Sequence, residues 1–203
     1  MSKHSNALFS IGTPEHLNTR ILHIDASEGV RSDNLLSGML ALGLPREELD
    51  EVLRAAAKGM SLVQLKRPAG MLAAIHAAPL EQELQTGFSK VITRLARAEA
   101  AAHGVTIDQV HFHQIGQWDT VEAVLGFCLG LIHFKVDRLT VSSIAVGQRH
   151  QDHSGIWQPQ IGPATAWLLE GWATHTHPEP GEWTTPTGAA IVTALAQPNG
   201  NGS

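Results

Sequence analysis

The stretch His111-Phe112-His113-Gln114-Ile115-Gly116-Gln117-Trp118-Asp119 decides the fold, because it predicts a short strand that turns at a glycine into a long apolar helix. We expect the strand over Val110–Ile115 and a buried helix over Asp119–Phe134. Successive residues of a strand point to opposite faces, so His111 and His113 would lie on the same face. Their imidazoles would then meet near a helix N-terminus, which suits a metal ion or an acidic ligand.

Strands alternate with helices on both sides of this stretch. We expect strands over 20–25 and 138–146, helices that begin at 33 and 45, and helices over 81–103, 163–170 and 186–196. Residues 58–80 show no assignable pattern. The alternation predicts an α/β fold, a single compact domain of mixed strands and helices over residues 20–197. A flexible N-terminal arm (1–19) would precede it, and a disordered tail (198–203) would follow.

The composition restricts the class of protein. The chain has 203 residues, 43% of them hydrophobic and 16% charged, which suits one globular domain. A net charge of −5 without a Lys/Arg cluster argues against nucleic acid as a partner. No apolar run resembles a signal peptide or reaches the ~20 residues of a membrane span. The single cysteine, Cys128, permits no intrachain disulfide, so we expect a buried thiol in a cytoplasmic protein.

Histidine and tryptophan are concentrated in the second half of the chain. Eight of the twelve histidines lie from His103 onward, and all five tryptophans lie between Trp118 and Trp183. We therefore expect a pocket for a small-molecule substrate in this half.

His111, His113 and Asp119 are the first candidate site. Two imidazoles and a carboxylate at a strand-to-helix turn could bind a metal or act on a substrate. Alternatively, Asp119 only caps its helix, in a capping box with Glu122 worth ~1 kcal/mol, and the histidines are ordinary hydrogen-bonded side chains. Spacing alone favours the second interpretation.

Two acidic residues near the N-terminus form a second candidate. Asp25 ends a predicted strand, where α/β sheets place ligands. Asp33 would lie at the start of the next helix, beside a glycine-containing turn suited to an anion. The alternative, an N-cap role for Asp33, stays open.

Two further segments carry weaker signals. His150 and His153, three residues apart, and the pair His175 and His177 could bind a metal, although exposed loops also accumulate histidine. Thr185 as N-cap with Pro186 in the first turn predicts a helix start whose hydroxyls and amides could hold a phosphate or carboxylate. An ordinary capped helix explains the same residues.

Four segments together resemble the LarC family of nickel-insertion proteins, which place nickel into a pyridinium bis-thiocarboxylate mononucleotide to complete the nickel-pincer cofactor. The matching segments are Ile21–Asp25 with Gly29, Ser32-Asp33 and Leu35-Leu36; Ala98-Glu99-Ala100 with Gly104 and His111–Asp119; Val141–Gly147; and Thr185–Ala190.

This resemblance implies a LarC N-terminal-like fold and a role in nickel-pincer cofactor maturation, with lyase-type nickel chelation as the chemistry. The candidate site residues, some matching the family motifs and some departing from them, fall into three sets. The catalytic set is His113, Asp119, Asp33 and His111. The substrate-binding set is Gln114, Trp118, Arg31, Thr185, Thr187, Gly188 and Trp183. The metal set is His111, His113 and Asp119, with His150 and His153 as weaker candidates.

The sequence departs from the family pattern in ways that keep alternatives open. Gln114 replaces the glutamate that follows His-Phe-His, and Arg31 adds a cation beside Asp33. A histidine-rich tract and the family's C-terminal portion are missing. One alternative is therefore a metal-independent lyase or cyclase without a cofactor, working by His/Asp acid–base chemistry in a Trp-lined pocket, for example in natural-product biosynthesis. Another is a non-catalytic subunit that needs a separate C-terminal partner protein, and a homo-oligomer also stays open.

Overall fold

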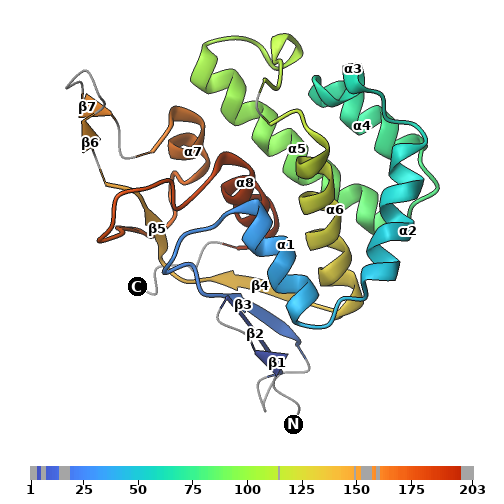
Figure 1. Ribbon diagram of the computed structural model, residues 1–203, viewed down its shortest axis with the longest axis horizontal. Helices are drawn as coiled ribbons and strands as arrows, with labels where there is room; N and C mark the ends of the chain where they lie inside the picture. The colour runs from blue at the N-terminus through green and yellow to red at the C-terminus, as the bar shows by residue number, and fades with distance from the viewer. Residues whose placement is uncertain are drawn as a thin grey trace.

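The computed structural model describes residues 4–5, 8–13, 19–113, 115–148, 150–151, 157–158 and 161–197. Helices pack against one face of a small sheet, and the two together form a single mixed α/β domain, as the sequence predicted (Figure 1). The helices are α1 (Ser32–Ala41), α2 (Arg46–Ala57), α3 (Leu62–Leu65), α4 (Pro68–Ala77), α5 (Gln82–His103), α6 (Trp118–His133), α7 (Pro163–Leu168) and α8 (Pro186–Leu195), with a 3-10 turn η1 (Ile107–Gln109).

The main sheet has the order β1-β2-β3-β4, formed by β1 (His4–Ser5), β2 (Phe9–Gly12), β3 (Ile21–Ile24) and β4 (Arg138–Val141). The first three strands are antiparallel, whereas β3 and β4 are parallel. Parallel neighbours need a long crossover connection, and here helices α1 to α6 provide it.

Two small ribbons complete the strands of the described chain. One pairs β5 (Ile144–Val146) with β8 (Thr174–Thr176) in parallel. The other pairs β6 (His150–Gln151) with β7 (Trp157–Gln158) antiparallel.

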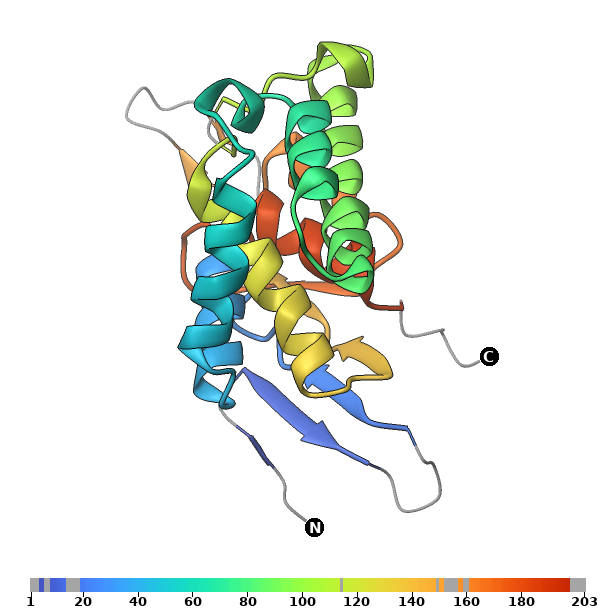
Figure 2. The same ribbon diagram turned by 90° about the vertical axis from the view of Figure 1, so that its right-hand side faces the viewer.

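Helix α5 is the central element of the helical layer. Its apolar face is buried, and it contacts α4, α6, α7 and α8. The helix ends where Gly104 adopts the left-handed conformation with φ 65°, a conformation that glycine adopts without steric cost. Helix α6 is buried along most of its length, as its continuous apolar sequence predicted, and it packs against α1, α2 and α5. Figure 2 shows it between α2 and α5. Among the described residues, no helix combines the length and apolar character needed to cross a membrane.

Residues 9–12 were expected to belong to a flexible N-terminal arm, and the structure shows that they do not. These residues form β2, which pairs with β3 along its whole length. Phe9 is 1% exposed and its ring lies 6.1 Å from that of Phe127. Burial of this ring fixes the strand, which is too short to show an alternating pattern in sequence. The other expected arm residues are described only in part, and the tail 198–203 lies outside the described residues.

The expected strands are also corrected at two places. Residues 110–113 form a loop, because Phe112 donates its backbone N–H to the carbonyl of Lys66 instead of joining a sheet. The expected strand over 138–146 is split at Ser142 and Ser143 into β4 and β5, which belong to different sheets. Residues 58–80, left unassigned from sequence, contain α3 and α4.

Candidate functional site

A cleft of about 720 Å³ lies where α1, α6 and α8 begin and α5 ends. Most of its lining residues are polar or charged, and they come from four separate parts of the chain. The lining residues are Arg31, Ser32, Asp33, Glu99, His103, His113, Ile115, Asp119, Thr120, Glu182, Thr185, Pro186 and Thr187. Six of the candidate site residues named from the sequence therefore share one cleft. They are Arg31, Asp33, His113, Asp119, Thr185 and Thr187.

The start of α8 fixes one wall of the cleft. Thr185 is the N-cap, and its hydroxyl accepts the backbone N–H of Gly188 at 3.2 Å, as the sequence predicted. The backbone N–H of Thr185 donates to the carbonyl of Val30 at 3.1 Å. A Cβ added to Gly188 would lie 2.1 Å from the same carbonyl oxygen, so only glycine allows this approach. The close contact places Arg31, the residue after Val30, beside the N-terminus of α8.

The loop that carries the two histidines forms the opposite wall. Phe112 is buried and anchors the loop, while His111 and His113 are both exposed. Their ring centroids lie 6.1 Å apart, so they share one side of the loop although no strand forms. His113 lines the cleft. Its carbonyl accepts a hydrogen bond from Lys66 Nζ at 3.2 Å, and Thr120 Oγ1 donates to the carbonyl of Ile115 at 2.6 Å.

Acidic side chains dominate the electrostatics of the cleft. Its four carboxylates are those of Asp33, Glu99, Asp119 and Glu182. The Glu99 side chain is 14% exposed and lies 3.4 Å from His103 Nε2. Arg31 Nε lies 3.3 Å from Asp33 Oδ1, but both side chains are largely exposed, so this ion pair contributes little to stability. The carboxylates outnumber the single arginine, so the cleft favours a cation.

Comparison with known proteins identifies the family. Residues 64–202 match the family model described as Nickel insertion protein, more than half of the chain. The chain belongs to the nickel insertion protein family. This confirms the family resemblance predicted from the sequence motifs.

Curated relatives of this family share the same printed name, "Putative nickel insertion protein". One from Pelobacter propionicus is 32% identical over an alignment of 203 positions. The alignment covers 87% of this chain and 51% of the relative. One from Geotalea uraniireducens is 33% identical over 202 residues, which cover 87% of this chain and 52% of the relative. The chain therefore spans about half the length of the curated relatives it matches. No solved structure matches.

The cleft contains side chains of the kinds that bind nickel. Imidazole and carboxylate groups are ligands that divalent nickel accepts, and the cleft contains both. Within the described part of the chain, however, no three His, Cys, Asp or Glu side chains lie close enough together to hold a metal ion. His113 and Asp119 line the cleft, but His111 is not among its lining residues.

The remaining metal candidates lie elsewhere or outside the description. His153 and the side chain of His150 fall outside the described residues. His175 Nδ1 lies 3.1 Å from the hydroxyl of Ser143. His177 is buried, with Nε2 3.3 Å from Glu28 and Nδ1 accepting the N–H of Glu179.

The alternative in which Asp119 and Asp33 cap their helices is wrong. Helix α6 is capped at Gln117 and α1 at Arg31, and neither start has a side-chain cap. Asp119 and Asp33 each lie in the first turn instead. There their negative charges still complement the positive end of the helix dipole, and both residues line the cleft.

Several other expected site residues lie away from the cleft. Trp118 and Gly188 are not in its lining, and Trp183 stacks on His177 with ring centroids 3.5 Å apart. Asp25 lines a separate cavity of about 410 Å³, where hydrogen bonds from Ser27 lower the pKa of its carboxyl. Gln114 is outside the described residues. The tryptophans expected to shape the pocket include Trp118, Trp167 and Trp172, which pack against the core.

Sequence reasoning missed several residues of the cleft. Glu99 and His103 are four residues apart at the end of α5, where they form one edge of the lining. Glu99 lies inside the Ala98-Glu99-Ala100 segment of the family resemblance, which was the available signal. Ser32 lies in the matching segment Ser32-Asp33, whereas Thr120 and Glu182 carried no spacing signal.

Proposed function

We propose that this chain takes part in nickel insertion and that Ni²⁺ meets an anionic small-molecule acceptor in the cleft. Membership of the nickel insertion family supports nickel as the metal. The observation that carries the proposal is the gathering of His113, Asp119 and Glu99 in one acidic cleft with the start of α8. Acidic groups concentrate a divalent cation, and imidazole supplies a ligand that nickel prefers over water.

Nickel is the cargo of this reaction rather than a resident cofactor. We propose that His113 and Asp119 act as temporary ligands and that the acceptor supplies the remaining ones. In the nickel-pincer pathway suggested by the LarC resemblance, the acceptor is a pyridinium bis-thiocarboxylate mononucleotide. Its sulfur atoms are softer donors than imidazole or carboxylate, so ligand exchange toward the acceptor releases the metal without any change of oxidation state.

The opposite wall suits the anionic part of the acceptor. Arg31 offers a guanidinium fork that matches the geometry of a phosphate. Thr187, in the first turn of α8, adds its hydroxyl beside the positive end of that helix. We propose that these residues orient the acceptor so that its metal-binding atoms face His113.

The complete reaction needs more than the cleft. The chain spans about half the length of its curated relatives, so we assign the remaining steps to a complementary C-terminal half, in the same or a separate polypeptide. On this proposal the chain alone binds Ni²⁺ reversibly, and turnover appears only with the complementary half present.

Nickel binding tests the proposal directly. We expect equilibrium dialysis of protein without a histidine tag to show Ni²⁺ uptake, weakened at least about tenfold by His113→Ala and by Asp119→Asn. His175→Ala is the matched control, because this exposed histidine lies outside the cleft lining. The proposal fails if the unmodified chain takes up no Ni²⁺, or if the control weakens uptake as much as His113→Ala.

A further inference from the structure

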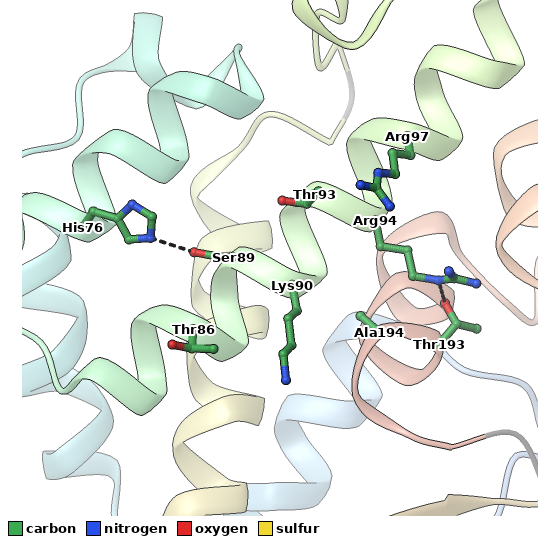
Figure 3. A pocket seen from close by; sticks show the side chains of 9 residues that line it. All are labelled: His76, Thr86, Ser89, Lys90, Thr93, Arg94, Arg97, Thr193 and Ala194. Atoms are coloured by element: carbon green, nitrogen blue, oxygen red, sulfur yellow. Dashed lines mark hydrogen bonds between the residues drawn. The ribbon is translucent and has the colours of Figure 1, made fainter.

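A second, basic groove of about 520 Å³ runs along α5 between α4 and α8 (Figure 3). Helix α5 supplies most of its lining, His76 of α4 forms one end, and Thr193 and Ala194 of α8 border the other. The α5 residues in the lining are Thr86, Ser89, Lys90, Thr93, Arg94 and Arg97. None of the lining residues is acidic, in a chain whose net charge is −5.

Three cations follow the helical repeat along this groove. Lys90, Arg94 and Arg97 are spaced i, i+4 and i+7, so they lie on one face of α5. At 1.5 Å per residue the first and last are separated by about 10 Å along the helix axis. Lys90 and Arg97 are exposed, and their charged ends are accessible to a ligand.

Arg94 is held in place before any ligand arrives. Its Nε donates to Thr193 Oγ1 at 2.6 Å and its Nη2 donates to the carbonyl of Leu168 at 3.2 Å. The guanidinium carbon also lies 5.4 Å from the centroid of the Trp167 ring. Burial lowers the pKa of Arg94 from its ordinary value, and the positive charge of Arg97 lowers it further. An anion between the two arginines would relieve this repulsion, and the fixed side chain would lose little entropy on binding.

Two hydroxyl groups of the groove already donate to carbonyls of α5 itself. Thr86 Oγ1 donates to the carbonyl of Gln82 at 2.8 Å, and Ser89 Oγ donates to the carbonyl of Gln85 at 2.7 Å. His76 Nε2, 3.0 Å from Ser89 Oγ, is therefore the donor in that contact. These two hydroxyls are therefore not free to donate to a ligand, whereas the exposed cations Lys90 and Arg97 are accessible to it.

We propose that this groove binds a small molecule that carries two or more phosphate groups. Arginine guanidinium groups match phosphate oxygens in a bidentate manner, and lysine adds a point charge. A row of three cations about 10 Å long can engage two phosphates at once, whereas a single phosphate reaches only part of the row. The groove shares no lining residue with the cleft, so this inference does not depend on the nickel proposal.

Isothermal titration with tripolyphosphate and with fructose 1,6-bisphosphate tests the proposal and separates an inorganic polyphosphate from an organic bisphosphate. We expect at least one of the two to bind more tightly than inorganic phosphate. The double substitution Lys90→Gln with Arg97→Gln should weaken that binding about tenfold. Raising the salt concentration should weaken it as well.

The matched control is Arg54→Gln with Lys58→Gln. These two exposed cations lie four residues apart at the end of α2, outside the groove, and their removal changes the net charge by the same amount. We expect this control to bind as the unmodified chain does, and thermal unfolding will verify that both double variants are folded. The proposal is overturned if neither compound binds, or if the control loses as much affinity as the groove variant.

Discussion

Replacing Gly188 with alanine should destabilise the protein and disturb the cleft together. A Cβ at this position would lie 2.1 Å from the carbonyl oxygen of Val30, 2.7 Å from its carbonyl carbon and 3.0 Å from Cα of Arg31. Ordinary contacts begin at 3.4 Å, so α8 and the turn before α1 must separate by about 1 Å. All three close atoms belong to the backbone, so no side-chain rotation can relieve the overlap.

The size of the effect follows from this separation. Overpacking of this kind costs about 1–3 kcal/mol. The hydrogen bond from Thr185 to Val30 would also be lost, which adds about 1 kcal/mol. Alanine recovers up to about 1 kcal/mol through its better helix propensity. We therefore expect the free energy of unfolding to fall by about 2–3 kcal/mol, which corresponds to a decrease in Tm of about 5–10 °C.

Urea denaturation followed by tryptophan fluorescence measures this change. Gly12→Ala is the matched control, because a Cβ there meets no atom within 4 Å, and we expect it to stay within about 0.5 kcal/mol of the unmodified chain. Gly188→Ala should also weaken Ni²⁺-dependent binding of an anionic acceptor, since it moves Arg31 away from Thr185. If Gly188→Ala is as stable as the control, the close approach of α8 to Val30 is refuted.

Two further predictions concern α8 and the buried thiol. Thr185→Ala removes the N-cap hydroxyl and should lower the free energy of unfolding by about 1 kcal/mol in urea denaturation, whereas Thr185→Ser should keep it; equal stability of the two variants would contradict the cap. Burial raises the pKa of Cys128 from 9.0 to about 12. Above pH 9 the thiol therefore ionises in the unfolded chain but not in the folded one, and the free energy of unfolding falls as the pH rises toward 12. Between pH 8 and pH 10 this decrease should be about 1 kcal/mol larger for the unmodified chain than for Cys128→Ala, and equal decreases would contradict the assignment.

Local patterns predicted α1, α2 and α5 to α8, because their signals lie within a few residues of each other, but they did not predict α3 and α4. The apolar spacing from Leu84 to Leu95 identified α5, and Gly104 marked its end. Thr185 and Pro186 identified the start of α8, including the hydrogen bond of the cap. The family resemblance depended on four such local segments and was confirmed.

Features that depend on distant residues could not be predicted in the same way. Strand β2 exists because Phe9 packs against Phe127, more than a hundred residues away, and its own four residues carry no pattern. The loop at 110–113 has alternating burial like a strand, but its backbone partner is Lys66. Sequence placed the histidines on one side, as found, and assigned them the wrong secondary structure.

Only part of the cleft could be predicted, because some of its residues lie in local motifs and others are brought there by contacts between distant elements. His113 and Asp119 belong to a family motif, Arg31 is a departure from one, and all three line the cleft. Glu99 and His103 were missed because only the packing of α5 against α6 and α8 brings the end of α5 to the cleft. The tryptophans were assigned to a pocket from their position in the sequence, yet Trp167 and Trp172 pack against the core.

The most direct test of the nickel proposal is anomalous diffraction from crystals soaked in Ni²⁺ and recorded at the nickel absorption edge. We expect an anomalous peak in the cleft, beside the imidazole of His113 and within reach of the Asp119 carboxylate. A peak found only elsewhere, for example near His175, or no peak at all, would contradict it.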